Sequence, residues 1–344
     1  MSEAPLEPDA PRLRNFALLV LFSLVFLTVG WSIYWYVARR IAASELESAL
    51  ARESAQGRTW SCASLRTSGY PLAIEFTCDR LAVVAKTQGA DFVAHAHQAI
   101  VRTLIYSPRR VAIDLRAPGD VSIENMPLKF DLDWRTLQFS TRGLPDRFDR
   151  LSVSGTDVEV RPDHGLAPAS IRALQMNFRH PWGVLDAPLN YEISIAGVRS
   201  PLFDATIGGV EPAVIATIGS ITEIDKAAGA TSPEMMDSWR TAGGRVAVTQ
   251  FSFVKGDFAA QMEGLLGLDQ MHRLDGKLDV RLHDAKAPFV NLAAKLGLGG
   301  ALLPLLAGSI FGDQNRETHV TASFADGRLG VGPLKGILPL PPLY

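Results

Sequence analysis

An uncharged stretch between Asn15 and Ala38 constrains this chain more than any other feature of its sequence. Most of its positions are Phe, Leu, Val, Ile, Trp or Tyr. A helix rising ~1.5 Å per residue crosses the ~30 Å hydrocarbon layer of a bilayer in about 20 residues. A buried helix of a soluble protein would carry a polar stripe, which this stretch lacks. We therefore predict a transmembrane span over residues 15–38, with the lipid bilayer as its first partner.

The span has the features of an uncleaved signal anchor. The apolar run is longer than the core of a cleaved signal peptide, and Arg39 and Arg40 stand where cleavage would fall. Aromatic rings close the run, as they do at lipid–water boundaries. The side chains expected to hold the anchor in the membrane are Phe16, Leu19, Phe22, Phe26, Trp31 and Trp35.

Four regions follow from this anchor. We expect residues 1–14 to be a disordered cytoplasmic tail and residues 15–38 to be the transmembrane signal anchor. Residues 39–57 continue as a helical stalk, because Gly57 follows them where a helix C-cap favours glycine. Residues 58–344 form a periplasmic β-rich domain.

The two cysteines decide the orientation, because arginines flank the span on both sides. Cys62 and Cys78 enclose the turn-prone sequence Thr67-Ser68-Gly69-Tyr70-Pro71. A hairpin centred on Tyr70 places Cys62 opposite Cys78, within reach of a disulfide that persists only in an oxidising compartment. The alternatives are two reduced core thiols or a reactive thiol near His95 or His97. The disulfide favours an inner-membrane, single-pass protein with most of its chain in the periplasm.

Beyond residue 59 the apolar pattern has the period of two that is typical of strands. Residues 128–134 alternate apolar and charged side chains without interruption. The pattern recurs at 111–116, 151–160, 191–198, 246–254 and 274–282, with turns expected at 118–119, 162–165, 255–257 and 326–327. Helices are expected at 232–242 and 288–310. We predict a mainly β fold with one N-terminal transmembrane helix: a large antiparallel sheet, curled or grooved, with a few short helices.

One internal segment is apolar but too interrupted to span a membrane. Residues 296–312 carry no charge, yet glycines and Pro304 interrupt them. We interpret the segment as a helical plug of the β core, or alternatively as an apolar lid over a groove. The candidate groove or lid residues are Leu296, Leu298, Leu302, Leu303, Leu305, Leu306, Ile310 and Phe311.

No familiar catalytic or cofactor-binding motif occurs in the chain. His95 and His97 have the spacing of some metal ligands, but no further motif completes a site, and Asp131 and Asp133 fit the polar face of a strand. We therefore predict no enzyme activity, no catalytic residue, no cofactor and no metal. A nucleic-acid partner is not expected either, because 34 Lys and Arg are interspersed with 36 Asp and Glu.

Several short sequences together resemble a known family. They are Trp60-Ser61-Cys62, Gly69-Tyr70-Pro71, Cys78-Asp79, Gly243-Gly244-Arg245, Asp275-Gly276-Lys277-Leu278, Asp326-Gly327-Arg328-Leu329, Gly332-Pro333-Leu334 and Pro341-Pro342-Leu343. With the anchor, they resemble the family "domain of unknown function 2125", membrane-anchored envelope proteins of Gram-negative bacteria. The resemblance covers about residues 15–344 and implies location and fold, but no activity. A looser similarity is to periplasmic β-groove proteins that handle lipids.

Three functional hypotheses follow. The first is a non-enzymatic protein that binds lipid or acyl chains in an apolar β-groove for envelope homeostasis, because an apolar sheet face needs a cover. The second is a membrane-tethered scaffold that assembles with other envelope proteins through an exposed strand edge. The third is a hydrolase with an unfamiliar site around Asp91, His95 and His97.

Overall fold

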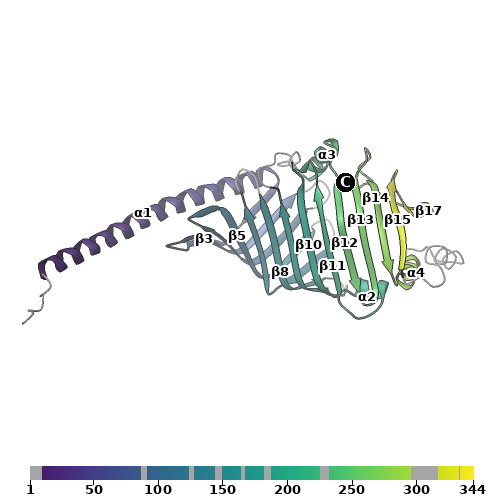
Figure 1. Cartoon of the computed structure of the whole chain (residues 1–344), viewed down its shortest axis with the longest axis horizontal. Helices are drawn as coiled ribbons and strands as arrows, with labels where there is room; N and C mark the ends of the chain where they lie inside the picture. Colours follow the sequence, from purple (N-terminus) through teal and green to yellow (C-terminus); the bar gives the residue numbers. More distant parts are fainter. Residues whose placement is uncertain are drawn as a thin grey trace, which may run out of the picture.

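The structure is a computed structural model of the whole chain, in which one long helix projects from one end of a large sheet (Figure 1). It describes residues 10–86, 91–123, 128–143, 149–163, 167–181, 187–224, 232–295, 317–332 and 334–344. Helix α1 (Ala10–Ala55) has 46 residues and contains the whole apolar stretch. It is long and apolar enough to cross a membrane. The helix runs without a break into the segment expected to be a stalk and ends just before Gly57, which has a φ of 79°.

In the described residues, 17 antiparallel strands form one sheet, which confirms the predicted fold class. The strands are β1 (Arg58–Ser61), β2 (Ser64–Ser68), β3 (Ala73–Lys86), β4 (Asp91–Leu104), β5 (Ser107–Ile123), β6 (Leu128–Asp133), β7 (Thr136–Arg142), β8 (Arg150–Pro162), β9 (Ala169–Arg179), β10 (Leu189–Val198), β11 (Ala213–Ile221), β12 (Val246–Lys255), β13 (Phe258–Leu268), β14 (Leu274–His283), β15 (Glu317–Ala325), β16 (Arg328–Val331) and β17 (Leu334–Pro339).

The strands follow one another as a meander, because each long strand pairs with the next along the chain. Two places depart from this order. β1 and β2 both pair with β3, and β6 and β7 lie end to end between β5 and β8.

The turn expected at Pro118-Gly119 is wrong, because β5 continues through both residues. β5 pairs with β7 up to Leu115 and with β6 from Gly119 onward, so the proline lies where the strand changes partner. Proline has no N–H to donate to a neighbouring strand, and at this position β5 lies between its pairing with β7 and its pairing with β6, where no such hydrogen bond is required. The sequence signal was therefore real, but it marked an irregularity within a strand.

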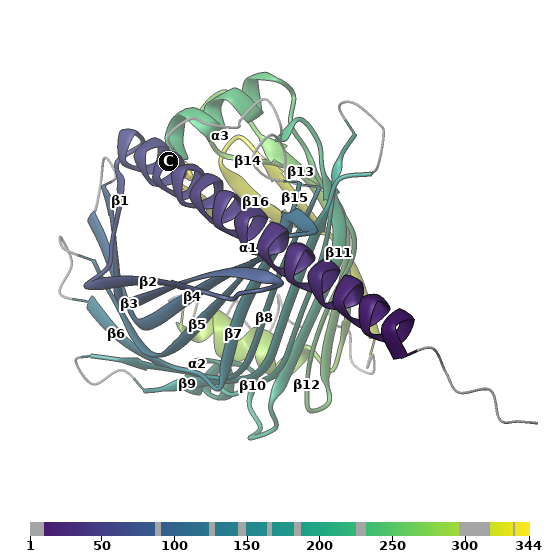
Figure 2. The ribbon, with the colours of Figure 1, turned by 90° about the vertical axis from the view of Figure 1, so that its left-hand side faces the viewer.

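The sheet curves around the side on which α1 and α2 (Pro201–Ile207) lie (Figure 2). We call this side the inner face. Helix α3 (Ser232–Thr241) lies where the sequence predicted a helix, with an acidic first turn. Helix α4 (Lys286–Lys295) begins two residues before the predicted start, and the rest of that prediction falls outside the described residues.

Candidate functional site

The inner face carries a continuous apolar row across the sheet. Directly paired residues of antiparallel strands lie on the same face, so the register shows which side chains are neighbours. From β3 to β15 the apolar row consists of Phe76, Val101, Ile113, Phe139, Val153, Met176, Ile193, Thr217, Phe251, Met262, Val280 and Val320. Only Thr217 in this row has a polar side chain.

The neighbouring row, one residue away on each strand, points to the opposite face and is mainly polar. It consists of Thr77, Ile100, Asp114, Gln138, Ser154, Gln175, Ser194, Ala216, Ser252, Gln261, Arg281 and His319. From β3 to β15 these two rows therefore alternate as expected when one face meets water and the other an apolar partner, although Val214, Ile218, Val254 and Leu265 are exposed apolar residues on the mainly polar face.

Most of the apolar row is only partly buried. Phe76 and Val280 are buried, but the other ten members, from Val101 to Val320, keep part of their surface exposed. No large side chain among the described residues is fully buried. Closed protein cores are packed as densely as organic crystals, so this face differs from a sealed core.

Helices cover the inner face at its margins. At one end, α1 packs on Ile74, Phe76 and Ile105 through Trp35, Leu46 and a set of small residues, Ala38, Ala42 and Ala43. Beside the far ends of β10 and β12, Phe203 of α2 meets Phe253 edge to face, with ring centroids 5.5 Å apart. Near α4, Ala285 packs with Phe258, Leu282 and Phe289.

The first hairpin, β2–β3, is fixed to α1 by specific polar contacts. The indole N–H of Trp31 donates to the carbonyl of Pro71, and that of Trp35 donates to the carbonyl of Ala73, both at 2.9 Å. The hydroxyls of Ser32 and Tyr70 lie 2.9 Å apart. The Trp35 and Tyr70 rings also meet edge to face at 5.5 Å. The Gly-Tyr-Pro sequence singled out above is thus the part of the hairpin that contacts α1.

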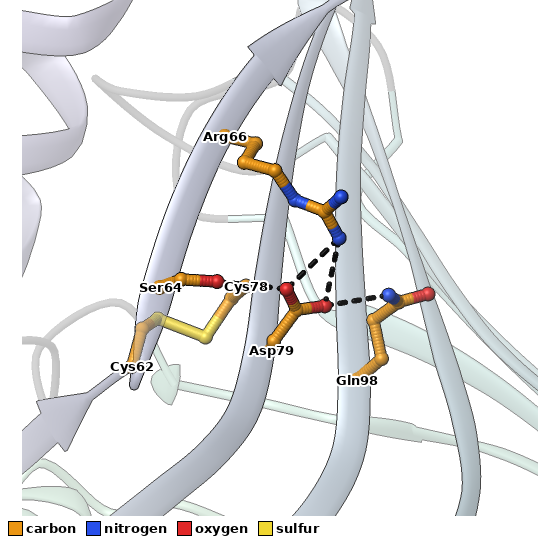
Figure 3. Close-up of polar contacts among 6 residues, drawn as sticks. All are labelled: Cys62, Ser64, Arg66, Cys78, Asp79 and Gln98. Atoms are coloured by element: carbon orange, nitrogen blue, oxygen red, sulfur yellow. Dashed lines mark hydrogen bonds and ion pairs between the residues drawn. A yellow bond between two sulfur atoms is a disulfide. The ribbon is translucent and has the colours of Figure 1, made fainter.

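The predicted disulfide between Cys62 and Cys78 is present, with a Cα–Cα separation of 5.4 Å (Figure 3). The predicted hairpin register is wrong, however, because Cys78 pairs with Leu65 and the turn is centred after Pro71. A hydrogen bond from Ala73 N to Gly69 O closes this wider turn. Cys62 lies in the break between β1 and β2, where Arg80 on β3 has a φ of 51°. This irregularity, which the pattern did not reveal, brings the sulfur atoms together.

Next to Cys78, the carboxylate of Asp79 is surrounded by a cluster of hydrogen-bond donors on the polar face of the sheet. Asp79 accepts hydrogen bonds from Gln98 Nε2 at 2.7 Å, Ser64 Oγ at 2.7 Å and Arg66 Nη2 at 2.8 Å (Figure 3). The hydrogen bonds from Gln98 and Ser64, and then the Arg66 charge, hold the pKa of Asp79 below its ordinary value. The cluster joins β2, β3 and β4 beside the disulfide, so both features stiffen the start of the sheet.

The residues of the hydrolase hypothesis do not form one group. His95 Nδ1 lies 3.0 Å from Asp120 Oδ2 on β5. Asp91 is the first residue of β4 and pairs with Lys86, the last residue of β3. Asp131 and Asp133 lie near Lys129 and Arg161, at 3.4 and 3.9 Å. Within the described parts of the chain, no three His, Cys, Asp or Glu side chains have the arrangement of a metal site.

The predicted anchor residues lie along α1. Phe16, Leu19, Phe22, Phe26 and Trp31 are exposed, while Trp35 is partly buried against the sheet. The predicted groove or lid residues, from Leu296 to Phe311, lie outside the described residues.

Sequence reasoning predicted no strand at β7 or β9 and therefore missed their inner-face residues, such as Phe139 and Met176. The alternation in 136–142 is the signal that would have found the first of them.

Comparison with known proteins identifies one family. A family model described as "Uncharacterized protein conserved in bacteria (DUF2125)" matches residues 35–339, which include the last part of α1 and every described strand of the sheet. No curated protein matches the chain, and no solved structure matches it. The match begins at Trp35, one of the α1 residues that contact the first hairpin.

Proposed function

The chain belongs to the bacterial family described as domain of unknown function 2125, and we propose that it is a non-enzymatic, membrane-anchored envelope protein that holds lipid acyl chains on its inner sheet face. In this proposal α1 is an inner-membrane anchor and the sheet is periplasmic. The ligand is an apolar chain, and the sheet supplies a surface along which that chain lies.

The apolar row is the observation that carries this proposal. Its side chains repeat across twelve consecutive positions of the sheet, and ten of them remain partly exposed. Removing apolar surface from water contributes roughly 25 cal/mol per Å², so such a face favours an apolar occupant. A hydrocarbon chain suits a long uniform row better than a compact polar substrate does, because the row offers few hydrogen-bonding groups.

Two further features support the location. Helix α1 has the length and apolarity of a membrane span. The Cys62–Cys78 disulfide persists in oxidising compartments and is uncommon in the cytosol. Both features agree with an anchor in the inner membrane and a body outside the cytoplasm.

Photo-crosslinking from single positions in cells tests the proposal. A benzophenone amino acid at Ile193 or Met176 samples the apolar row, and the same amino acid at the adjacent Ser194 or Gln175 samples the opposite face. The two residues of each pair are neighbours in one strand, so they differ mainly in the face of the sheet that they sample. We expect lipid adducts, identified by mass, from Ile193 and Met176 and none from Ser194 and Gln175. Equal lipid labelling on both faces, or none on either, would refute acyl-chain binding.

The sheet edges favour a second candidate, a scaffold. Among the described strands, β17 pairs with β16 alone and β2 pairs with β3 alone, so both edges are open to strand addition. The same benzophenone approach at Leu338 of β17 separates the hypotheses. A stoichiometric protein adduct there, together with no lipid adduct from Ile193, would favour the scaffold.

A further inference from the structure

We propose that the turns of the β2–β3 and β4–β5 hairpins enter the lipid–water boundary beside α1, so that the sheet rests on the membrane surface. The proposal depends on the proposed function in one respect, that α1 is embedded in a bilayer. It adds a second membrane contact, made by the β body itself.

The two turns expose large apolar side chains. Tyr70 and Leu72 in the first turn are 49% and 55% exposed, and Tyr106 in the second is 71% exposed. The second turn also has a residue that packs inward, since Ile105 beside Tyr106 is 6% exposed and belongs to the cluster under α1, and the first turn leads directly into Ile74 of β3, which is 3% exposed and belongs to the same cluster. The exposed side chains are therefore held in place by an ordered core. Tyrosine suits a lipid–water boundary because its ring is apolar and its hydroxyl is polar.

The exposed side chains of the turns lie beside the apolar part of α1, and this position favours lipid as their partner. Tyr106 and Ile105 line an apolar recess together with Phe26, Leu27, Gly30 and Trp31 of α1. These helix residues lie within the uncharged stretch that fits a bilayer. A surface beside an embedded part of α1 meets lipid at the same depth, so no other partner is needed to cover it.

The hydrogen bonds of the first turn are compatible with that depth. A backbone group in hydrocarbon needs an internal partner, because no water is present to provide one. The carbonyls of Pro71 and Ala73 accept from Trp31 and Trp35. The carbonyl of Gly69 accepts from Ala73 N, and that of Leu72 accepts from Ile105 N at 3.2 Å. Proline at position 71 has no N–H that would need a partner.

The experiment uses depth-dependent quenching in the full chain. Both cysteines are joined in the disulfide, so one introduced cysteine gives a single labelling site. Leu72→Cys and Tyr106→Cys carry an environment-sensitive fluorophore, and the protein is reconstituted in vesicles of phosphatidylethanolamine and phosphatidylglycerol. Val210→Cys and Met271→Cys are matched controls, because these apolar residues are 79% and 63% exposed and lie in the connections that precede β11 and β14, far along the sheet from β3 and β5 (Figure 1). All four sites are exposed, and an unchanged melting temperature verifies that each variant is folded.

We expect nitroxide groups on the lipids to quench the labels at positions 72 and 106, while aqueous iodide does not. The labels at 210 and 271 should show the opposite. A label at Phe22→Cys in α1 separates the two proposals. If position 22 is lipid-protected and positions 72 and 106 are open to iodide, the second contact is refuted and the anchor stands. If position 22 is also open to iodide, both are refuted. Protection from iodide without nitroxide quenching at 72 and 106 would indicate a protein cover and would also overturn the proposal.

Discussion

Trp35 of α1 donates its indole N–H to the carbonyl of Ala73, 38 residues later in the chain, at 2.9 Å. The same ring meets Tyr70 and belongs to the cluster around Phe76. Because a hydrogen bond, an aromatic contact and an apolar cluster converge on one side chain, α1 is fixed to the sheet. In the proposed function, where α1 is the anchor, this junction would set the orientation of the sheet relative to the membrane. The boundary between span and stalk at residue 38 stays a prediction, since α1 is continuous there.

Trp35→Phe should destabilise this junction. Phenylalanine keeps an apolar ring but loses the donor, which leaves the carbonyl of Ala73 without its partner. We expect a loss of about 1–2 kcal/mol in the free energy of unfolding, from the net value of a hydrogen bond and the cost of an unsatisfied carbonyl. Thermal unfolding of the reconstituted full chain measures it. Leu19→Phe, on an exposed part of α1, is the control and should leave the melting temperature unchanged. Equal effects of the two substitutions would contradict a specific role for the indole.

Replacing both cysteines by alanine should lower stability by about 3 kcal/mol, because the disulfide closes a loop with a sequence separation of 16 residues. The measurement is the denaturant midpoint of the variant against the oxidised wild type. Thiol alkylation of intact cells provides the second readout. We expect no labelling of the wild type until a reductant is added. Free thiols without reductant, reachable only from the cytosol, would contradict both the disulfide and the periplasmic location.

Acid should weaken the β2–β3–β4 cluster through Asp79. Its pKa is lower in the folded state than in the unfolded state, so the carboxylate stabilises the fold at neutral pH. This stabilisation is complete above the unfolded pKa and is lost as the pH falls through the folded value. The melting temperatures of the wild type and Asp79→Asn should therefore differ at pH 7 and converge in strong acid.

Asp131→Asn serves as the control for Asp79, because Asp131 is exposed and its nearest cation is Lys129 at 3.4 Å. It should produce a smaller difference from the wild type at pH 7. A constant gap between wild type and Asp79→Asn at every pH would show that the substitution acts through packing, and would refute the electrostatic explanation.

Lys255→Met should loosen the connection between β10 and β11. Lys255 is 3% exposed, and its Nζ donates to Asp204 Oδ1 at 2.7 Å, Glu211 O at 2.7 Å and Gly209 O at 3.1 Å. Methionine fills similar space but leaves these acceptors without their donor. We expect a loss of about 2 kcal/mol and faster hydrogen exchange in α2. Lys277→Met, at an exposed position of β14, should change neither. Unchanged exchange in α2 for Lys255→Met would be inconsistent with this role.

Local sequence patterns predicted much of the fold. Residues 274–282 alternate clearly, residues 246–254 alternate with one shift after Val248, and the structure places β14 and β12 over nearly the same residues. The helix at 232–242 was also correct, because its proline and acidic first turn are local signals. The register of the first hairpin was not predicted correctly, since it depends on a wide turn and on the conformation of Arg80. The irregularity at Pro118 was likewise mistaken for a turn, because the proline signal does not distinguish the end of a strand from a change of partner within it.

The sequence predicted an apolar sheet face, but not which residues of the strands form the apolar row. The sequence indicated a one-sided apolar sheet and attributed a groove to residues 296–311, which lie outside the described residues. The groove or lid at residues 296–311 stays a prediction. The apolar row runs through the strands, and only their pairing shows that Ile193 of β10 and Phe251 of β12 belong to it. The contacts of Trp31 with Pro71 and of His95 with Asp120 were equally invisible, because each joins residues far apart in the chain.

The sequence by itself determined that the chain has an apolar helix, alternating strands and a pair of cysteines, because these depend on side-chain types at short, regular spacings. Only the tertiary structure decided which strands adjoin, where the apolar row runs and which turns lie against α1. Strand pairing and helix docking bring together residues distant in the chain, and the free energy of those contacts is not contained in either segment alone.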